Sequence, residues 1–140
     1  MTPLTASTTV RGVPLTDFKT ALSEQARSAN NTIVAPRIVN YQNPGNGWDK
    51  GPIRTPELGR EWARWASQQG IDGIKFNAFD PEIMAALLSE AKLLKLGSTA
   101  HLGQMGVGRM NAIQSARLGL GALTHFYGLF ESMYDDHQVQ

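Results

Sequence analysis

The stretch that decides the fold is GIKFNAFDPEIMAALLSEAKLLKLGSTAHL, residues 73–102. It begins with a short β-prone run at residues 73–77 and ends with another at residues 98–102. Between them, Asp80-Pro81-Glu82 has the features of a helix start: a capping residue, a proline in the first turn, and an acid near the positive end of the helix dipole. Apolar residues then recur at helical spacing until Gly97, where we expect the helix to end. The stretch therefore predicts a strand, a helix and a second strand.

The same alternation continues on both sides of this stretch. Before it, the sequence predicts a strand at 7–11, a helix from about Thr16, a strand at 32–41, a Gly-, Pro- and Asn-rich loop at 42–54 and a helix from Thr55 to Gly70. After it, the sequence predicts a helix at about 109–118, a strand at 120–126 and a flexible tail from about Glu131. Strands that alternate with helices favour βα units and a parallel sheet, so the fold class is α/β. Periodicity alone leaves open whether the sheet is doubly wound or part of a closed barrel. No Gly-rich phosphate loop follows a strand, which weakens nucleotide-binding versions of the fold.

Composition narrows the functional classes. The 140 residues are enough for one domain, and the net charge of +1 with no run of like charges gives no reason to expect nucleic acid or an anionic membrane as partner. The absence of cysteine excludes disulfides and thiolate metal sites. No signal-peptide pattern and no long apolar segment occurs, so we expect a soluble protein whose compartment the sequence leaves open.

Nitrogen-bearing side chains stand near the carboxyl ends of three successive predicted strands. They are Lys75, His101 and His125. Because sites in parallel α/β folds form at that end of the strands, we expect the three side chains to converge. Two neutral imidazoles suit a divalent metal such as zinc. A protonated lysine has no lone pair and binds a metal only as a carbamate; otherwise its charge is paired with Asp80 or Glu82, or reaches solvent.

Three motifs resemble the amidohydrolase superfamily: Gly73-Ile74-Lys75-Phe76, Ser98-Thr99-Ala100-His101 and Gly121-Ala122-Leu123-Thr124-His125-Phe126-Tyr127-Gly128. The resemblance is closest to its imidazolonepropionase-like and metal-dependent dipeptidase branch. It implies a (β/α)8 TIM-type barrel in which Lys75 is a carboxylated lysine bridging the metals and His101 and His125 bind one of them. A metal-activated water would then hydrolyse an amide or related C–N bond in a small-molecule or peptide-like substrate.

The sequence also departs from that family. The resemblance implies a His-x-His motif at the first strand and an aspartate at the eighth, and neither occurs in this sequence. By this alignment residues 1–140 form a single partial barrel domain that holds strands two to six, or about five βα units. A whole barrel needs roughly 250 residues. We therefore expect a fragment that is inactive in isolation, and whose open edges are covered by a homo-oligomer or a complementing chain.

Other residues and other functions remain candidates. Tyr127 and Arg37 are the expected substrate-binding residues, whereas His137 is expected to be solvated and the three tryptophans to be core or loop anchors. One alternative function keeps the fold and uses Lys75 as a Schiff-base nucleophile, as in lyases. Another is a non-catalytic remnant domain that associates with another chain.

Overall fold

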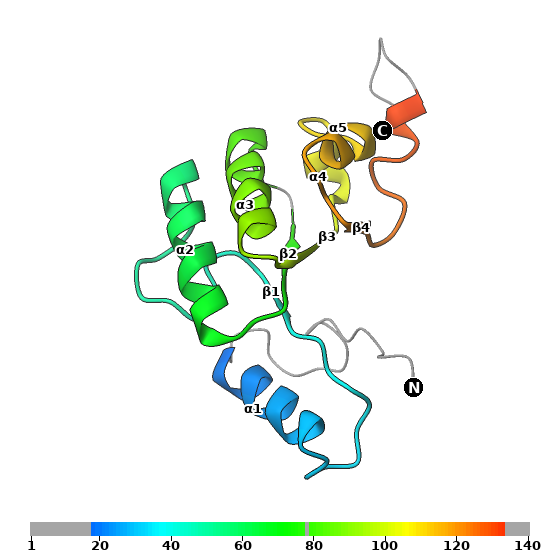
Figure 1. Ribbon diagram of the computed structural model, residues 1–140. Helices are drawn as coiled ribbons and strands as arrows, with labels where there is room; N and C mark the ends of the chain where they lie inside the picture. Colours follow the sequence, from blue (N-terminus) through cyan, green and yellow to red (C-terminus); the bar gives the residue numbers. More distant parts are fainter. Residues whose placement is uncertain (1–17, 78, 134–140) are drawn as a thin grey trace.

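The computed structural model describes residues 18–77 and 79–133, and its centre is a four-stranded parallel sheet (Figure 1). The strands are β1 (Tyr41–Gln42), β2 (Gly73–Phe76), β3 (Gly97–Ala100) and β4 (Ala122–Leu123), and they lie side by side in chain order. The helices are α1 (Phe18–Ala29), α2 (Pro56–Gln69), α3 (Pro81–Leu93), α4 (Gly103–Val107) and α5 (Ala112–Arg117), followed by the 3-10 helix η1 (Glu131–Met133). The predicted α/β class with parallel strands is confirmed, and the order of the described strands shows no reversal of the kind that marks a doubly wound sheet.

Helix α2 begins and ends where its capping residues predict. The Thr55 hydroxyl accepts a hydrogen bond from the backbone N–H of Leu58 at 3.3 Å, Pro56 is the first helical residue, and Gly70 ends the helix in a left-handed conformation with φ 96°. Helix α3 also has a proline in its first turn, but the Asp80 carboxylate makes no cap and instead pairs with Arg109.

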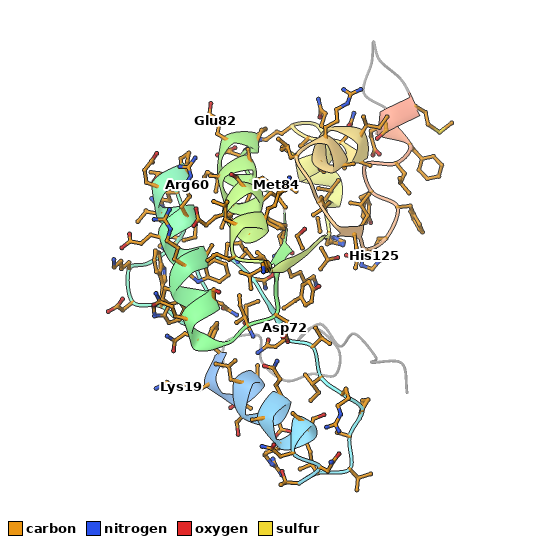
Figure 2. The ribbon with its side chains drawn as sticks, in the orientation of Figure 1. Lys19, Arg60, Asp72, Glu82, Met84 and His125 are labelled. Carbon is orange, nitrogen blue, oxygen red and sulfur yellow. The ribbon has the colours of Figure 1, made fainter. Side chains whose placement is uncertain are left out.

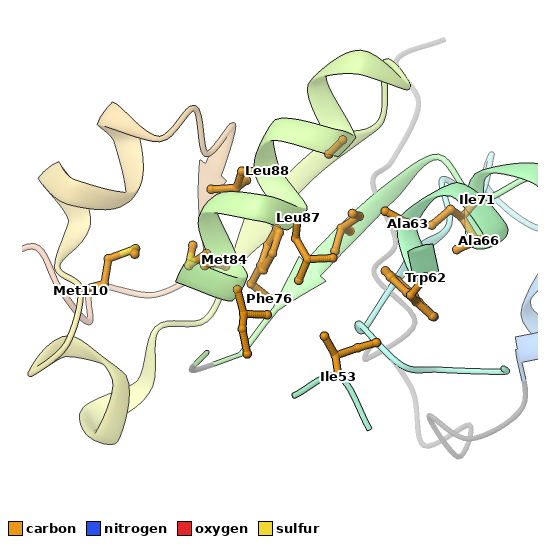
Figure 3. Close-up of a cluster of buried hydrophobic side chains, with 14 of the residues drawn as sticks. Ile53, Trp62, Ala63, Ala66, Ile71, Phe76, Met84, Leu87, Leu88 and Met110 are labelled. Carbon is orange, nitrogen blue, oxygen red and sulfur yellow. The ribbon is translucent and has the colours of Figure 1, made fainter. Parts of the chain in front are cut away.

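The hydrophobic core lies between the sheet and the pair α2 and α3, which pack side by side (Figures 1 and 3). Ile74 and Phe76 of β2 point into it, and Trp62 of α2 is completely buried, with its indole N–H donating to the Asn46 carbonyl at 3.1 Å. The two helices are also joined by Arg64, which forms two hydrogen bonds with the buried carboxylate of Glu90. Trp62 is therefore a core anchor, as predicted.

The opposite face of the sheet carries one large aromatic side chain at the amino ends of the strands. A Cβ atom placed on Gly73 would lie 2.4 Å from the Tyr41 ring, and one placed on Gly97 would lie 2.0 Å from the Tyr41 hydroxyl oxygen. The Tyr41 ring therefore lies flat across β2 and β3 and occupies the space that two side chains would otherwise fill. We call this arrangement of Tyr41, Gly73 and Gly97 the tyrosine floor.

Several predicted boundaries are wrong. The strand predicted at 32–41 is reduced to β1, because the preceding segment runs back along α1: the Ser28 hydroxyl donates to the Pro36 carbonyl at 2.6 Å. The helix predicted at 109–118 is shortened to α5, and α4 is a separate helix before it that the sequence did not predict. Gly97 opens β3 rather than ending α3, since the turn between them uses Lys95 at φ 57°.

Other predictions fare differently. The loop at 42–54 is confirmed except for Gln42, which belongs to β1. The strand predicted at 7–11, and Tyr134 and His137 in the tail, lie outside the described residues. Among residues 18–77 and 79–133, no helix combines the length and the apolar character needed to cross a bilayer.

Candidate functional site

Lys75, His101 and His125 lie at or just beyond the carboxyl ends of three adjacent parallel strands. Lys75 is the third residue of β2, His101 directly follows β3, and His125 comes two residues after β4. Since β2, β3 and β4 are neighbours in the sheet, these ends share one edge. Figure 2 shows His125 near the end of β4, away from α1.

The face on which Lys75 lies follows from the alternation of side chains along β2. Ile74 and Phe76 are completely buried against the helices, so Lys75 projects from the other face, which is also the face of the tyrosine floor. Lys75 is half-buried, and this burial lowers the pKa of its amine below the ordinary lysine value. Its register partner on β3 is Thr99.

His101 continues β3 by one residue, because its backbone N–H donates to the Phe76 carbonyl at 2.9 Å. It stands two residues after Thr99 and therefore on the same face as Lys75. The pKa of His101 is lowered from its ordinary value, first by burial and then by the positive charges of His125 and Lys75.

The backbone turns sharply at His125. Thr124 still pairs with β3, since its N–H and its hydroxyl both donate to the Ala100 carbonyl, at 2.8 and 2.9 Å. Continued alternation would place His125 on the helix-covered face, because Ala122 is in register with Thr99. His125 instead has φ 67°, in the left-handed region. The change brings its ring to 4.7 Å from the His101 ring, between centroids, at an interplanar angle of 85°.

The two predicted substrate-binding residues lie in different places. The Tyr127 ring lies 5.3 Å from that of His101, so it belongs to the same site. Arg37 donates to the Ala29 carbonyl at 2.7 Å and to the Asn31 side chain at 3.0 Å, at the carboxyl end of α1. In the part of the chain that the structure describes, no hydrogen bond or ring contact joins Arg37 to the two histidines.

The side chains present fit a divalent metal through the two imidazoles. Neutral imidazole nitrogens are good ligands for zinc, and the rings of His101 and His125 are close enough to face one ion. Over the described ranges, no group of three His, Asp or Glu side chains stands together, so the candidate for a third ligand among these residues is Lys75. A protonated amine cannot fill that role, whereas a carbamate can.

Sequence reasoning missed two features of this site. One is Thr99, whose hydroxyl is buried and finds no hydrogen-bond partner among the described residues. Its place two residues before His101 was a usable signal, because both side chains must share a face. The other is the left-handed backbone of His125, which no sequence pattern announced.

Searches against models of protein families and among curated proteins find no match for this chain. Solved structures do resemble it. One is the crystal structure of a Xaa-Pro dipeptidase with bound methionine in the active site, with a TM-score of 0.58, 20% identity, and coverage of 74% of this chain and 33% of the other. Another is described as a "putative prolidase from Bifidobacterium longum", with a TM-score of 0.54, 21% identity, and coverage of 73% and 28%.

This chain therefore spans about a third or less of the length of these two proteins. At such low identity the likeness is one of fold. It shows that the α/β arrangement with four parallel strands is shared with larger peptidase structures.

Proposed function

We propose that this chain is a section of an amidohydrolase-type (β/α)8 barrel in which Lys75, His101 and His125 bind a divalent metal, with zinc as the first choice. The reaction would be hydrolysis of an amide or related C–N bond. The observation that carries the proposal is the meeting of the His101 and His125 rings at the ends of adjacent strands, on the face from which Lys75 projects.

Two features support the barrel. The parallel strands follow one another in chain order, as in a singly wound barrel, and α2 and α3 cover one face of the sheet. The tyrosine floor fills the other face with a side chain, as the interior layers of such barrels are filled. The similarity to a Xaa-Pro dipeptidase structure supports the hydrolase class and a peptide-like substrate.

Lys75 would act as a carbamate. Its neutral amine attacks the carbon of carbon dioxide, the nitrogen lone pair forms the new N–C bond, one C=O pair moves onto oxygen, and a proton leaves the nitrogen for solvent. The amine must lose its proton first. The lowered pKa of Lys75 therefore favours the step, because it increases the neutral fraction near neutral pH.

Each of the remaining residues has a distinct part. His101 and His125 would hold the ion, and the lowered pKa of His101 keeps that imidazole neutral and able to bind to lower pH. Tyr127, beside His101, would contact the substrate. When bound, a divalent ion supplies an activated water and polarises the scissile carbonyl.

Metal content tests the proposal in the full-length protein. The variants Lys75→Gln, His101→Asn and His125→Asn should each lower the zinc bound per chain, measured by elemental analysis after dialysis. Asparagine is the chosen replacement at 125, because it tolerates the left-handed backbone there. His137→Asn is the matched control and should retain the metal. Unchanged zinc in all three site variants would end the proposal.

The lowered pKa of Lys75 also favours a second candidate, a Schiff-base lyase, since a neutral amine is the form that attacks a carbonyl. Borohydride with a carbonyl substrate distinguishes the two functions. A covalent adduct on Lys75, located by mass spectrometry, would support the lyase, whereas a carbamate leaves no reduced adduct.

The remnant-domain alternative draws support from apolar side chains that follow β4. Phe126, Leu129, Phe130 and Met133 are between 48 and 72% exposed, and β1 and β4 are the outer strands of the described sheet. Such surface favours burial against another chain. Light scattering should then report a mass above that of one chain, and a stable monomer would count against association.

A further inference from the structure

The hydroxyl of Thr99 is buried on the site face of β3. Thr99 is 9% exposed, and its Oγ1 has no partner among the described residues. Buried polar atoms in folded proteins are nearly always hydrogen-bonded. A buried hydroxyl without a partner has lost its hydrogen bonds to water and gained none in return, which destabilises the folded state. An unpaired buried hydroxyl therefore indicates a partner group that the described residues do not supply.

The position of Thr99 indicates which group that is. Thr99 is directly opposite Lys75 in the register of β2 and β3, and both project from the same face. Thr99 is also one layer deeper than His101, nearer the tyrosine floor, so it faces the lysine rather than the outer end of the site.

We propose that Thr99 is a positioning residue whose hydroxyl donates a hydrogen bond to a carboxylate oxygen of carboxylated Lys75. This inference rests on the proposed function, because it requires the carbamate. A carbamate has two oxygens with about four lone-pair directions, and metal ligation leaves some of them for hydrogen bonds. A hydroxyl supplies one donor, and a donor to an ionised acceptor makes a stronger bond than a neutral pair does.

The hydrogen bond would act on the equilibrium between amine and carbamate. Carbamate formation is reversible, so any interaction made only by the carboxylated lysine raises its occupancy. The hydroxyl would also restrict the rotation of the carbamate and leave its other oxygen for the metal.

The test compares Thr99→Val, Thr99→Ser and the unaltered full-length protein. Valine has nearly the shape of threonine without the hydroxyl, and serine keeps the hydroxyl without the methyl group. Each zinc-loaded protein is equilibrated with ¹³C-bicarbonate, and the carbamate carbon is quantified by ¹³C NMR, with Lys75→Gln as the zero reference. We expect a clear signal in the unaltered and Thr99→Ser proteins and a several-fold weaker one in Thr99→Val.

Melting temperature of the metal-free, bicarbonate-free proteins is the second measurement. In that state the Thr99 hydroxyl has no partner among residues 18–77 and 79–133, so Thr99→Val should raise the melting temperature. A hydroxyl with a merely structural role would give the opposite shift. Lower carbamate occupancy together with a higher melting temperature supports the inference, and a lower melting temperature overturns it.

The outcomes separate this inference from the proposed function. Full carbamate signal in Thr99→Val overturns the role of Thr99 and leaves the metal site intact. If the unaltered protein gives no carbamate signal, Lys75 is not carboxylated. That result contradicts this part of the proposed function and the inference about Thr99 together.

Discussion

The imidazole rings of His101 and His125 meet edge to face, with 4.7 Å between centroids and 85° between planes. Two side chains that are 24 positions apart in the sequence are thus neighbours at one edge of the sheet. Their meeting depends on local backbone: His101 extends β3 by one hydrogen bond, and His125 leaves β4 through a left-handed residue. Both parts of that relationship can be tested separately.

The pKa of His101 should lie below the ordinary histidine value of about 6.5 and should rise when Lys75 loses its charge. Removing a nearby positive charge makes protonation easier. NMR titration of the metal-free protein, kept free of bicarbonate, should therefore show a higher His101 pKa in Lys75→Gln than in the unaltered protein. Lys92→Gln on the exposed side of α3 is the control and should leave the pKa of His101 unchanged. An equal rise in both variants would contradict the role of Lys75.

The same shift predicts how stability depends on pH. The folded protein holds the proton of His101 less tightly than the unfolded chain does, so the unfolded state binds more protons in the window below about 6.5. The contribution of His101 to the free energy of unfolding is therefore complete above that pH and is lost as pH falls through the folded pKa. Denaturant titrations should show that the free energy of unfolding falls between pH 7 and pH 5. In His101→Asn this decrease should be smaller.

Replacing His125 should affect stability according to backbone conformation rather than size. At φ 67°, a β-branched side chain is strained against the backbone, whereas asparagine tolerates this conformation and glycine has no Cβ. His125→Val should therefore lower the free energy of unfolding by about 1–2 kcal/mol relative to His125→Asn. Urea denaturation monitored by tryptophan fluorescence measures the difference, and equal stability of the two variants would show that the left-handed turn is absent in solution.

The tyrosine floor predicts a coupling between Gly97 and Tyr41. Gly97→Ala places a methyl group 2.0 Å from the tyrosine hydroxyl oxygen, and overpacking of this kind costs about 1–3 kcal/mol. In the Tyr41→Phe background that oxygen is gone, so the same substitution should cost less. A double-mutant cycle of unfolding free energies checks this, and strict additivity would mean that the ring does not cross β3.

Two arginine–glutamate pairs that involve α2 offer a matched comparison. Arg64 pairs with Glu90, whose side chain is 7% exposed, at 2.8 Å, whereas Arg60 pairs with the 80%-exposed Glu57 at 3.9 Å. Arg64→Ala should lower the melting temperature clearly more than Arg60→Ala, because it leaves a buried carboxylate without its partner. Similar small losses in both would show that Glu90 reaches water on its own.

Local signals explain what the sequence predicts well. Thr55, Pro56 and Gly70 bound α2 because each has a specific backbone or capping preference, and that preference needs no tertiary information. The alternation of strands and helices likewise predicts the parallel sheet. Lys75, His101 and His125 can be assigned to one edge because parallel strands end together.

Features set by tertiary contacts could not be predicted in this way. Residues 32–40 have strand-like composition, yet hydrogen bonds to the end of α1 hold Pro36 and Arg37 there instead of in the sheet. The strand expected at 120–126 is only two residues long, since Gly119 and His125 both adopt left-handed conformations around it. The partnerless hydroxyl of Thr99 becomes visible only when burial and hydrogen bonds are known together.

The tyrosine floor separates the stability of this sheet from its chemistry. The Tyr41 ring of β1 fills the layer at the amino ends of β2 and β3. The residues in the next layer toward the carboxyl ends therefore do not have to fill that space. Lys75 and Thr99 occupy that layer, where the Thr99 hydroxyl is buried without a hydrogen-bond partner among the described residues. Positions of this kind can change identity during evolution, or by protein engineering, while the scaffold beneath them persists.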